Sequence, residues 1–158
     1  MPTSEQTMIL DSVDRFLERE VRPVVRELEA SDTYPKSIVD RMIELGLFGA
    51  TISTEYGGLG LSATTYASII ERISAVWMSV SGIFNSHLIM AAAVQRFGTT
   101  DQKKHYLPRF ASGELRGGIG LTEPDCGTDL QGIRTQAVGE DDHYVVNGVK
   151  TWITNSAE

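Results

Sequence analysis

Glycine, threonine and acidic residues are concentrated in residues 117–129, Gly-Gly-Ile-Gly-Leu-Thr-Glu-Pro-Asp-Cys-Gly-Thr-Asp. Backbone N–H groups and hydroxyls in such a loop can hold a carbonyl, a ring nitrogen or a phosphate. No Gly-Lys-Ser/Thr follows, so the segment is not a P-loop. Glu123 stands where a third glycine would follow Gly118 and Gly120, which excludes the dinucleotide fingerprint. An acidic surface turn is the alternative that these residues leave open.

Trp152 and Thr154 alternate along the run 149–154, which has the composition of a strand. Side chains two positions apart in a strand point to the same face. An indole ring beside a hydroxyl can stack on a planar cofactor and hydrogen-bond its edge. The alternative is a core tryptophan with a neighbouring threonine.

The histidines and the single cysteine form no metal-binding or nucleophilic constellation, and we predict neither a metal site nor a catalytic residue among them. His87 lies in an apolar helical pattern that predicts a buried histidine, whereas His105 and His143 have polar surroundings. Cys126 is interpreted as a small packing residue in a turn. A lone cysteine cannot form an internal disulfide, which is typical of a reducing compartment.

Three carboxylates follow one another in the same segment, at Glu123, Asp125 and Asp129. We interpret them as capping or solvent-facing groups of an exposed turn, not as an acid–base pair.

The first 113 residues show helical periodicity. Apolar residues recur every three or four positions over 4–29, with a break expected near Arg22 because Pro23 lacks a backbone donor. Further helices are expected over 35–45, ending at Gly46, over 62–73 with Ser62 as cap, over 81–97, and over 100–110 with an interruption at Pro108. Residues 53–61 predict a loop.

After residue 113 the pattern changes to short apolar runs separated by turn residues. Strands are expected over 115–122, 133–138, 143–147 and 149–154, with a hairpin connection at 139–142 and a turn at Asn147-Gly148. A few short strands alone are marginally stable. We therefore expect these 158 residues to be the first part of a longer chain.

Composition excludes several classes of protein. The net charge is −7 and no basic stripe exists, so no nucleic-acid or anionic-membrane partner is expected. The most apolar stretch, residues 88–94, is shorter than the roughly 20 residues that span a bilayer. The acidic N-terminal segment lacks the features of a signal or transit peptide. A cytoplasmic location is expected, with the mitochondrial matrix as the alternative.

The order of several motifs resembles the acyl-CoA dehydrogenase family over essentially the whole chain. Five weaker motifs come first: Asp32-Thr33-Tyr34-Pro35, Leu45-Gly46-Leu47 with the loop 55–61, Phe97-Gly98-Thr99, Tyr106-Leu107-Pro108 and Ser112-Gly113-Glu114. The most specific pieces are residues 121–129, which look like the family's LTEPxAGSD, and residues 147–155, which look like its NGxKxWITN. Cys126 replaces the usual alanine and Thr128 the usual serine.

The resemblance implies an α+β architecture. An all-α N-terminal helical domain, residues 1–113, would be followed by the start of a β-barrel middle domain, residues 114–158. The family's C-terminal helical bundle would be absent from these residues.

The resemblance also implies FAD as cofactor. The flavin-contacting segment would run from 119 to 128, with Thr122 donating a hydrogen bond to the ring's polar edge, and Trp152 and Thr154 would lie at the ring. Thr128 would face the pantetheine part of a CoA substrate. The residues assigned to cofactor binding are Ile119, Gly120, Leu121, Thr122, Glu123, Pro124, Asp125, Cys126, Gly127, Thr128, Trp152, Ile153 and Thr154.

The implied activity is α,β-dehydrogenation of an acyl-CoA thioester, with electron-transfer flavoprotein as acceptor and a homo-oligomer as the full-length assembly. The family's glutamate base lies in the C-terminal bundle, so no catalytic residue is assigned here and the segment alone is expected to be inactive. The alternatives are a flavin monooxygenase or oxidase of the same fold, and a non-catalytic or split-enzyme subunit that acts as an interaction module.

Overall fold

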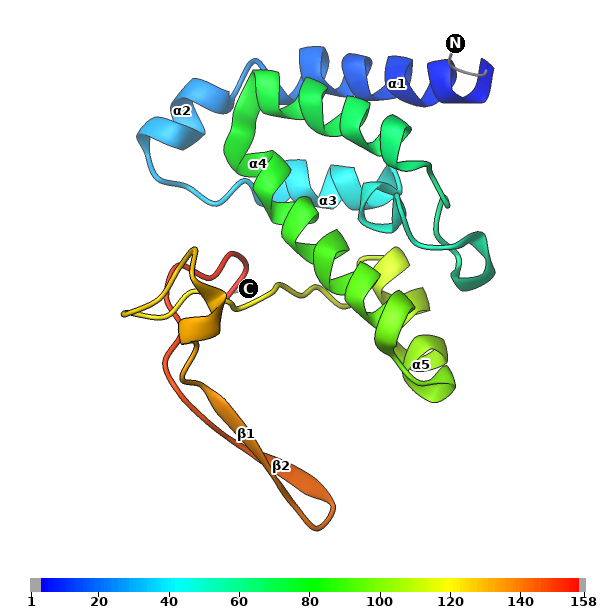
Figure 1. Ribbon diagram of the computed structural model, residues 1–158. Helices are drawn as coiled ribbons and strands as arrows, with labels where there is room; N and C mark the ends of the chain where they lie inside the picture. The colour runs from blue at the N-terminus through cyan, green and yellow to red at the C-terminus, as the bar shows by residue number, and fades with distance from the viewer. Residues whose placement is uncertain (1–3, 157–158) are drawn as a thin grey trace.

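The computed structural model describes residues 4–156, which form a helical body followed by an irregular C-terminal lobe (Figure 1). The body contains helices α1 (Ser4–Phe16), α2 (Val25–Ala30), α3 (Lys36–Glu44), α4 (Ala63–Phe97) and α5 (Thr100–Ala111). The lobe, residues 114–156, contains strands β1 (Gln136–Glu140) and β2 (His143–Asn147). Short helical turns lie at Leu17–Val21, Leu47–Gly49, Thr54–Tyr56 and Leu130–Gly132. The predicted order of a helical domain followed by β structure is confirmed.

The break predicted near Arg22 is confirmed. α1 continues into a π-helical turn, in which the amide of Arg22 donates to the carbonyl of Leu17 at 2.8 Å. Pro23 has no amide to continue the ladder, and α2 begins only at Val25. The chain therefore changes direction between α1 and α2.

Helix ends follow the predicted capping residues. Gly46 takes a left-handed backbone conformation with φ of 75° directly after α3, as expected of a glycine that ends a helix. The hydroxyl of Ser62 accepts from the amide of Thr65 at 3.2 Å at the start of α4. A cap that the sequence analysis did not predict stands at the start of α5, where Thr99 and Gln102 form a reciprocal capping box.

The break predicted between helices over 62–73 and 81–97 is confirmed as a kink at Trp77, which divides α4 into two arms. The interruption is confined to Trp77, whose φ of −155° and ψ of 99° lie outside the helical region. Polar contacts bridge this kink: the hydroxyl of Ser74 donates to that of Ser81 at 2.9 Å, and the indole N–H of Trp77 donates to Glu29 at 3.2 Å. The first arm of α4 therefore ends at the kink, and the second arm runs in a new direction (Figure 1).

Taken over both arms, α4 is long and apolar enough to cross a membrane by length and composition alone, which the sequence prediction from residues 88–94 missed. Its composition follows from its place in the core. The residues it buries there are Thr65, Ile69, Ile73, Trp77, Val80, Ser81, Ile83, Phe84, His87, Leu88 and Ala91.

The prediction that Pro108 interrupts the last helix is also wrong. α5 continues to Ala111, and the amide of Ser112 donates to the carbonyl of Pro108 at 3.1 Å. Both Pro108 and Lys104, whose carbonyl loses its helical partner to the proline, are exposed. Water can therefore satisfy the carbonyl.

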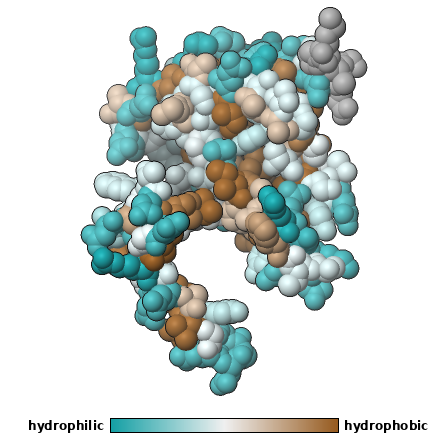
Figure 2. All heavy atoms as spheres, viewed as in Figure 1, coloured by the Kyte–Doolittle hydropathy of each residue, from teal (hydrophilic) through white to brown (hydrophobic). Residues whose placement is uncertain are grey.

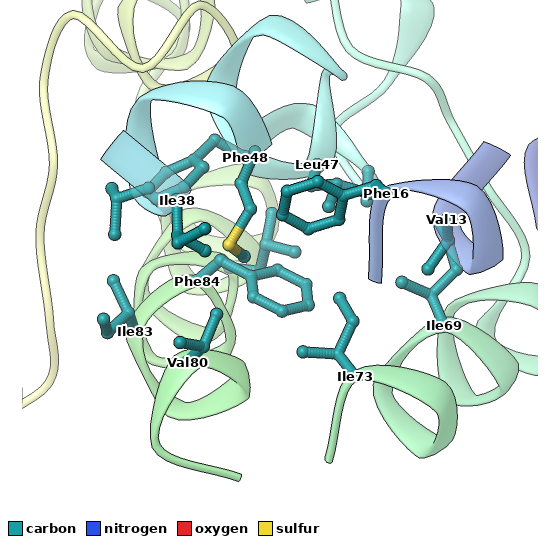
Figure 3. Packing of buried hydrophobic residues seen from close by; sticks show 14 of the residues in the cluster. Val13, Phe16, Ile38, Leu47, Phe48, Ile69, Ile73, Val80, Ile83 and Phe84 are labelled. Carbon is teal, nitrogen blue, oxygen red and sulfur yellow. The ribbon is translucent and has the colours of Figure 1, made fainter. Parts of the chain in front are cut away.

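The hydrophobic core lies between α1, α3 and α4, where Phe16, Phe48 and Phe84 pack together (Figure 3). His87 is fully buried beside them, as predicted, and its Nε2 lies 3.2 Å from the carbonyl of Phe110. Burial lowers the pKa of His87, so the imidazole is neutral and donates to that carbonyl.

The lobe contains one antiparallel ribbon, in which Gln136 pairs with Asn147 and Glu140 with His143. The hairpin predicted at 139–142 is confirmed. The strands predicted over 115–122 and 149–154 are wrong, since both runs are irregular and are joined by one backbone bond, from Thr151 N to Thr122 O at 3.0 Å. No third strand pairs with the ribbon among residues 4–156, and an extended run needs such a neighbour to become a strand.

Core packing predicts a large difference between two identical substitutions on α4. Phe84→Ala removes a fully buried ring and is expected to lower the free energy of unfolding by about 3–5 kcal/mol. Phe97, which is 78% exposed, serves as the control, and Phe97→Ala is expected to cost less than about 1 kcal/mol. Urea denaturation followed by circular dichroism measures both. Equal losses would contradict the packing described here.

Candidate functional site

The carboxylate of Glu123 is the centre of the lobe. It is only 7% exposed and accepts three hydrogen bonds: from the amide of Arg134 at 2.8 Å, the amide of Thr135 at 2.9 Å and the ammonium of Lys150 at 2.9 Å. The nearby Thr135 hydroxyl, the Lys150 ammonium and the two amides lower the pKa of Glu123 to about 2. The side chain is ionised and all its neighbours stabilise that form.

The interpretation of Glu123 as an exposed turn residue is therefore wrong, because its side chain turns inward and accepts from the amides of Arg134 and Thr135. Its low pKa and three donors also leave it unable to take or give a proton near neutral pH. The same interpretation is confirmed for two neighbours. Asp125 forms an exposed ion pair with Arg134 at 3.3 Å, and Asp129 caps a helical turn by accepting from the amide of Gln131 at 3.2 Å.

Lys150 is the residue that sequence reasoning missed. Its ammonium donates to the carbonyl of Leu121 at 3.0 Å as well as to Glu123. With the backbone bond between Thr151 and Thr122, it joins the two most specific motifs, which lie almost thirty positions apart. The sequence did carry a signal for Lys150. It is the lysine of the NGxKxWITN motif and lies two residues before the first predicted cofactor contact of that motif, Trp152.

The segment that precedes Glu123 is open to the outside. Ile119 and Leu121 are each 39% exposed. Within the described chain, no backbone N–H of residues 117–122 donates a hydrogen bond, although the carbonyls of Gly117, Leu121 and Thr122 accept them. The segment thus presents unpaired donors beside apolar side chains.

Residues 124–128 form the turn in which the sequence places Cys126. Glu123 and Cys126 exchange two backbone hydrogen bonds, at 2.8 and 3.2 Å. Cys126 is half-buried against Gly132, which agrees with a packing role. Pro124, Gly127 and Thr128 are exposed.

Trp152 is 91% exposed and has a φ of 58°. Because residues 149–154 are not a strand, the expectation that Trp152 and Thr154 share a strand face is wrong. Thr154 instead borders a cavity of about 420 Å³, together with Ile153 and with Trp77 and Ile83 of α4. The indole and the hydroxyl are near in sequence but are placed by an irregular turn.

These residues fit a planar ring with a polar edge. The donor set consists of unpaired amides and the Thr122 hydroxyl, and the exposed indole of Trp152 offers a flat apolar face. Hydrophobic residues also line the inner side of the hollow between the helical body and the lobe (Figure 2). Such a mixture suits an isoalloxazine ring, which has a polar edge and apolar faces, better than a phosphate, which has no apolar face to bury.

Comparison with known families decides the class. The family model described as Acyl-CoA dehydrogenase, N-terminal domain, matches residues 3–114, and the model of the middle domain matches residues 118–158. The chain belongs to the acyl-CoA dehydrogenase family. Glu123 and Lys150 lie in the part that matches the middle domain.

A curated relative of the same family matches almost the whole of this chain. The chain is 39% identical over 154 residues to a short-chain specific acyl-CoA dehydrogenase of Clostridium acetobutylicum, covering 97% of this chain and 41% of the relative. The chain therefore spans about two fifths of the length of that relative.

Solved structures show the same fold. One is described as the electron transferring flavoprotein of Acidaminococcus fermentans, with a TM-score of 0.93 and 35% identity over 100% of this chain and 42% of the matched one. Another is an acyl-CoA dehydrogenase complexed with FAD from Bacillus anthracis, with a TM-score of 0.86 and 37% identity over 99% of this chain and 27% of the other.

The Glu123 network predicts a local pH dependence. Glu123→Gln is expected to lower the hydrogen-exchange protection of the Arg134 and Thr135 amides at pH 7, because a neutral amide accepts more weakly and adds donors of its own. The folded pKa of about 2 lies below the ordinary 4.5, so the stabilisation is complete above pH 4.5 and is lost as the pH falls toward 2. The difference between wild type and variant should therefore narrow over that range.

The matched control is Glu140→Gln, whose carboxylate is 60% exposed on β1. It should leave the protection of the Arg134 and Thr135 amides unchanged. Equal effects of the two substitutions at pH 7 would show that the Glu123 carboxylate does not hold the lobe.

Proposed function

We propose that this chain supplies the helical wall and the first part of the flavin site of an FAD-dependent acyl-CoA dehydrogenase. One observation carries the proposal. Lys150 and Glu123 hold the LTEP and WITN motifs together, and this contact gathers the unpaired amides, the Thr122 hydroxyl and the Trp152 indole in one lobe. Membership of the family and the FAD complex of a relative at 37% identity support it.

Each residue type has a physical role in this proposal. The amides of residues 119–122 and the Thr122 hydroxyl donate to the polar edge of the isoalloxazine ring, and Trp152 packs on its face. Thr154 supplies a second hydroxyl at the cavity edge. Thr128, exposed at the end of the turn, faces the pantetheine part of the CoA thioester.

Bound FAD supplies the acceptor for the hydride that leaves the β-carbon of the acyl thioester. The chain's own residues bind and orient it. No residue of this chain is assigned as the base that removes the α-proton, and Glu123 is unsuited because its pKa is about 2. We place the base in the C-terminal bundle of the full-length enzyme.

Electron-transfer flavoprotein is the proposed electron acceptor. The support is membership of the acyl-CoA dehydrogenase family, which implies this acceptor. A homo-oligomer is the proposed assembly of the full-length enzyme. A short-chain acyl-CoA is the first substrate to test, because a relative at 39% identity is described as short-chain specific.

The activity is tested on the complete gene product loaded with FAD and mixed with butyryl-CoA in the absence of oxygen. A dehydrogenase should lose its flavin absorbance and form the enoyl thioester without oxygen. Air is then admitted: in a dehydrogenase the reduced flavin should react slowly with oxygen, whereas rapid return of the flavin absorbance with one equivalent of peroxide would favour the oxidase alternative. No reduction of the flavin by butyryl-CoA without oxygen would contradict the proposal.

A variant tests the assigned cofactor contact in the same protein. Trp152→Ala removes a side chain that contributes nothing to the core, so we expect unchanged stability and FAD binding weakened up to about tenfold, as for loss of a ring contact. Tyr144→Ala is the control, since Tyr144 is an aromatic residue 74% exposed on β2 of the same lobe. Flavin fluorescence titration measures both, and equal affinities would exclude Trp152 from the site.

A further inference from the structure

Asn155 joins three segments that are far apart in the sequence. Its side-chain amide donates to the carbonyl of Ile83 in α4 at 2.9 Å and to the carbonyl of Gly117 at 3.3 Å. Its backbone has a φ of 67°, which asparagine tolerates better than most residues. One half-buried side chain thus connects the WITN turn, helix α4 and the start of the open segment.

The two glycines at the start of the open segment allow this close approach. A Cβ at Gly118 would lie 2.7 Å from the carbonyl oxygen of Thr154, and one at Gly117 would lie 2.6 Å from Cε of Met90 in α4. Backbone therefore packs directly against the residue that carries the proposed flavin hydroxyl. Small displacements of the turn would move Thr154 by the same amount.

The partner in α4 is itself firmly placed. Ile83 is 8% exposed and belongs to the hydrophobic core, in the arm of the helix that follows the kink at Trp77. Ile83, Trp77, Thr154 and Asn155 border the same cavity of about 420 Å³. The contact thus ties the lobe to the rigid part of the helical body.

We infer that Asn155 is a positioning residue that fixes the Thr154 turn against α4 and so sets the geometry of the flavin site. The inference rests on the proposed function. Within residues 4–156, Asn155 is the one residue of the WITN turn, residues 152–155, whose side chain hydrogen-bonds to the helical body. Its loss should loosen the lobe and weaken FAD binding together.

The test compares variants of the complete gene product. Asn155→Asp keeps shape and backbone tolerance but places a carboxylate against two carbonyl oxygens. Asn155→Gly keeps the backbone conformation and removes the side chain, so it serves if the aspartate variant fails to fold. Asn147→Asp is the matched control, because Asn147 is exposed at the end of β2.

Two readouts are measured: the FAD dissociation constant by fluorescence titration, and the rate of limited proteolysis between α5 and β1 without FAD. We expect Asn155→Asp to weaken FAD binding by about tenfold or more and to speed cleavage, Asn155→Gly to do so less, and Asn147→Asp to match wild type. Faster cleavage with unchanged FAD affinity, or no change in either, would overturn the inference.

The outcome is separable from that of the proposed function. If the wild-type protein takes up no FAD, the proposed function fails and the positioning role falls with it. If the wild type binds FAD and reacts with butyryl-CoA while the Asn155 variants bind FAD equally well, the proposed function stands and only the positioning role is lost.

Discussion

A buried carboxylate holds the C-terminal lobe together. Among residues 114–156, Glu123 alone is buried, and every hydrophobic residue of the core lies in the helical body. A buried charge destabilises a fold unless it is paired and hydrogen-bonded. Two amides and the Lys150 ammonium meet this requirement. The conformation of both specific motifs follows from satisfying one carboxylate.

The two halves of the chain are therefore stabilised by different forces. The helical body buries aromatic and aliphatic side chains of α1, α3 and α4 in one cluster. The lobe relies on directional polar contacts and leaves its apolar residues open, Val138, Val146 and Trp152 among them. Exposed apolar side chains beside unpaired amides are what a cofactor site needs before its ligand is bound. Because its apolar side chains are not buried, the lobe depends on a few polar contacts for its stability.

Between the halves, contact is made by small residues and single side chains. Asn155 reaches α4, Gly117 lies against Met90, and the guanidinium of Arg116 donates to the hydroxyl of Tyr34 at 2.7 Å. Such contacts fix the orientation of the lobe relative to the helical body through a few side chains. The lobe is the part of the chain that matches the family's middle domain, from residue 118 onward.

The sequence by itself determined the class of fold, the helix ends at Gly46 and Ser62, and the segments that carry the motifs. These features depend on local capping chemistry, hydrophobic periodicity and residue order, all of which are present in the chain before it folds. The hairpin at 139–142 was predictable for the same reason.

Only the tertiary structure decided the role of Glu123, the direction in which α4 turns at Trp77 and the irregular path of residues 149–154. The burial of Glu123 depends on amides 11 and 12 positions away, at Arg134 and Thr135, and on Lys150 27 positions away. The indole of Trp77 at the kink donates to Glu29, 48 positions away, and the course of residues 149–154 depends on whether a neighbouring strand is present. Partners distant in sequence set each of these outcomes, and no local pattern encodes them.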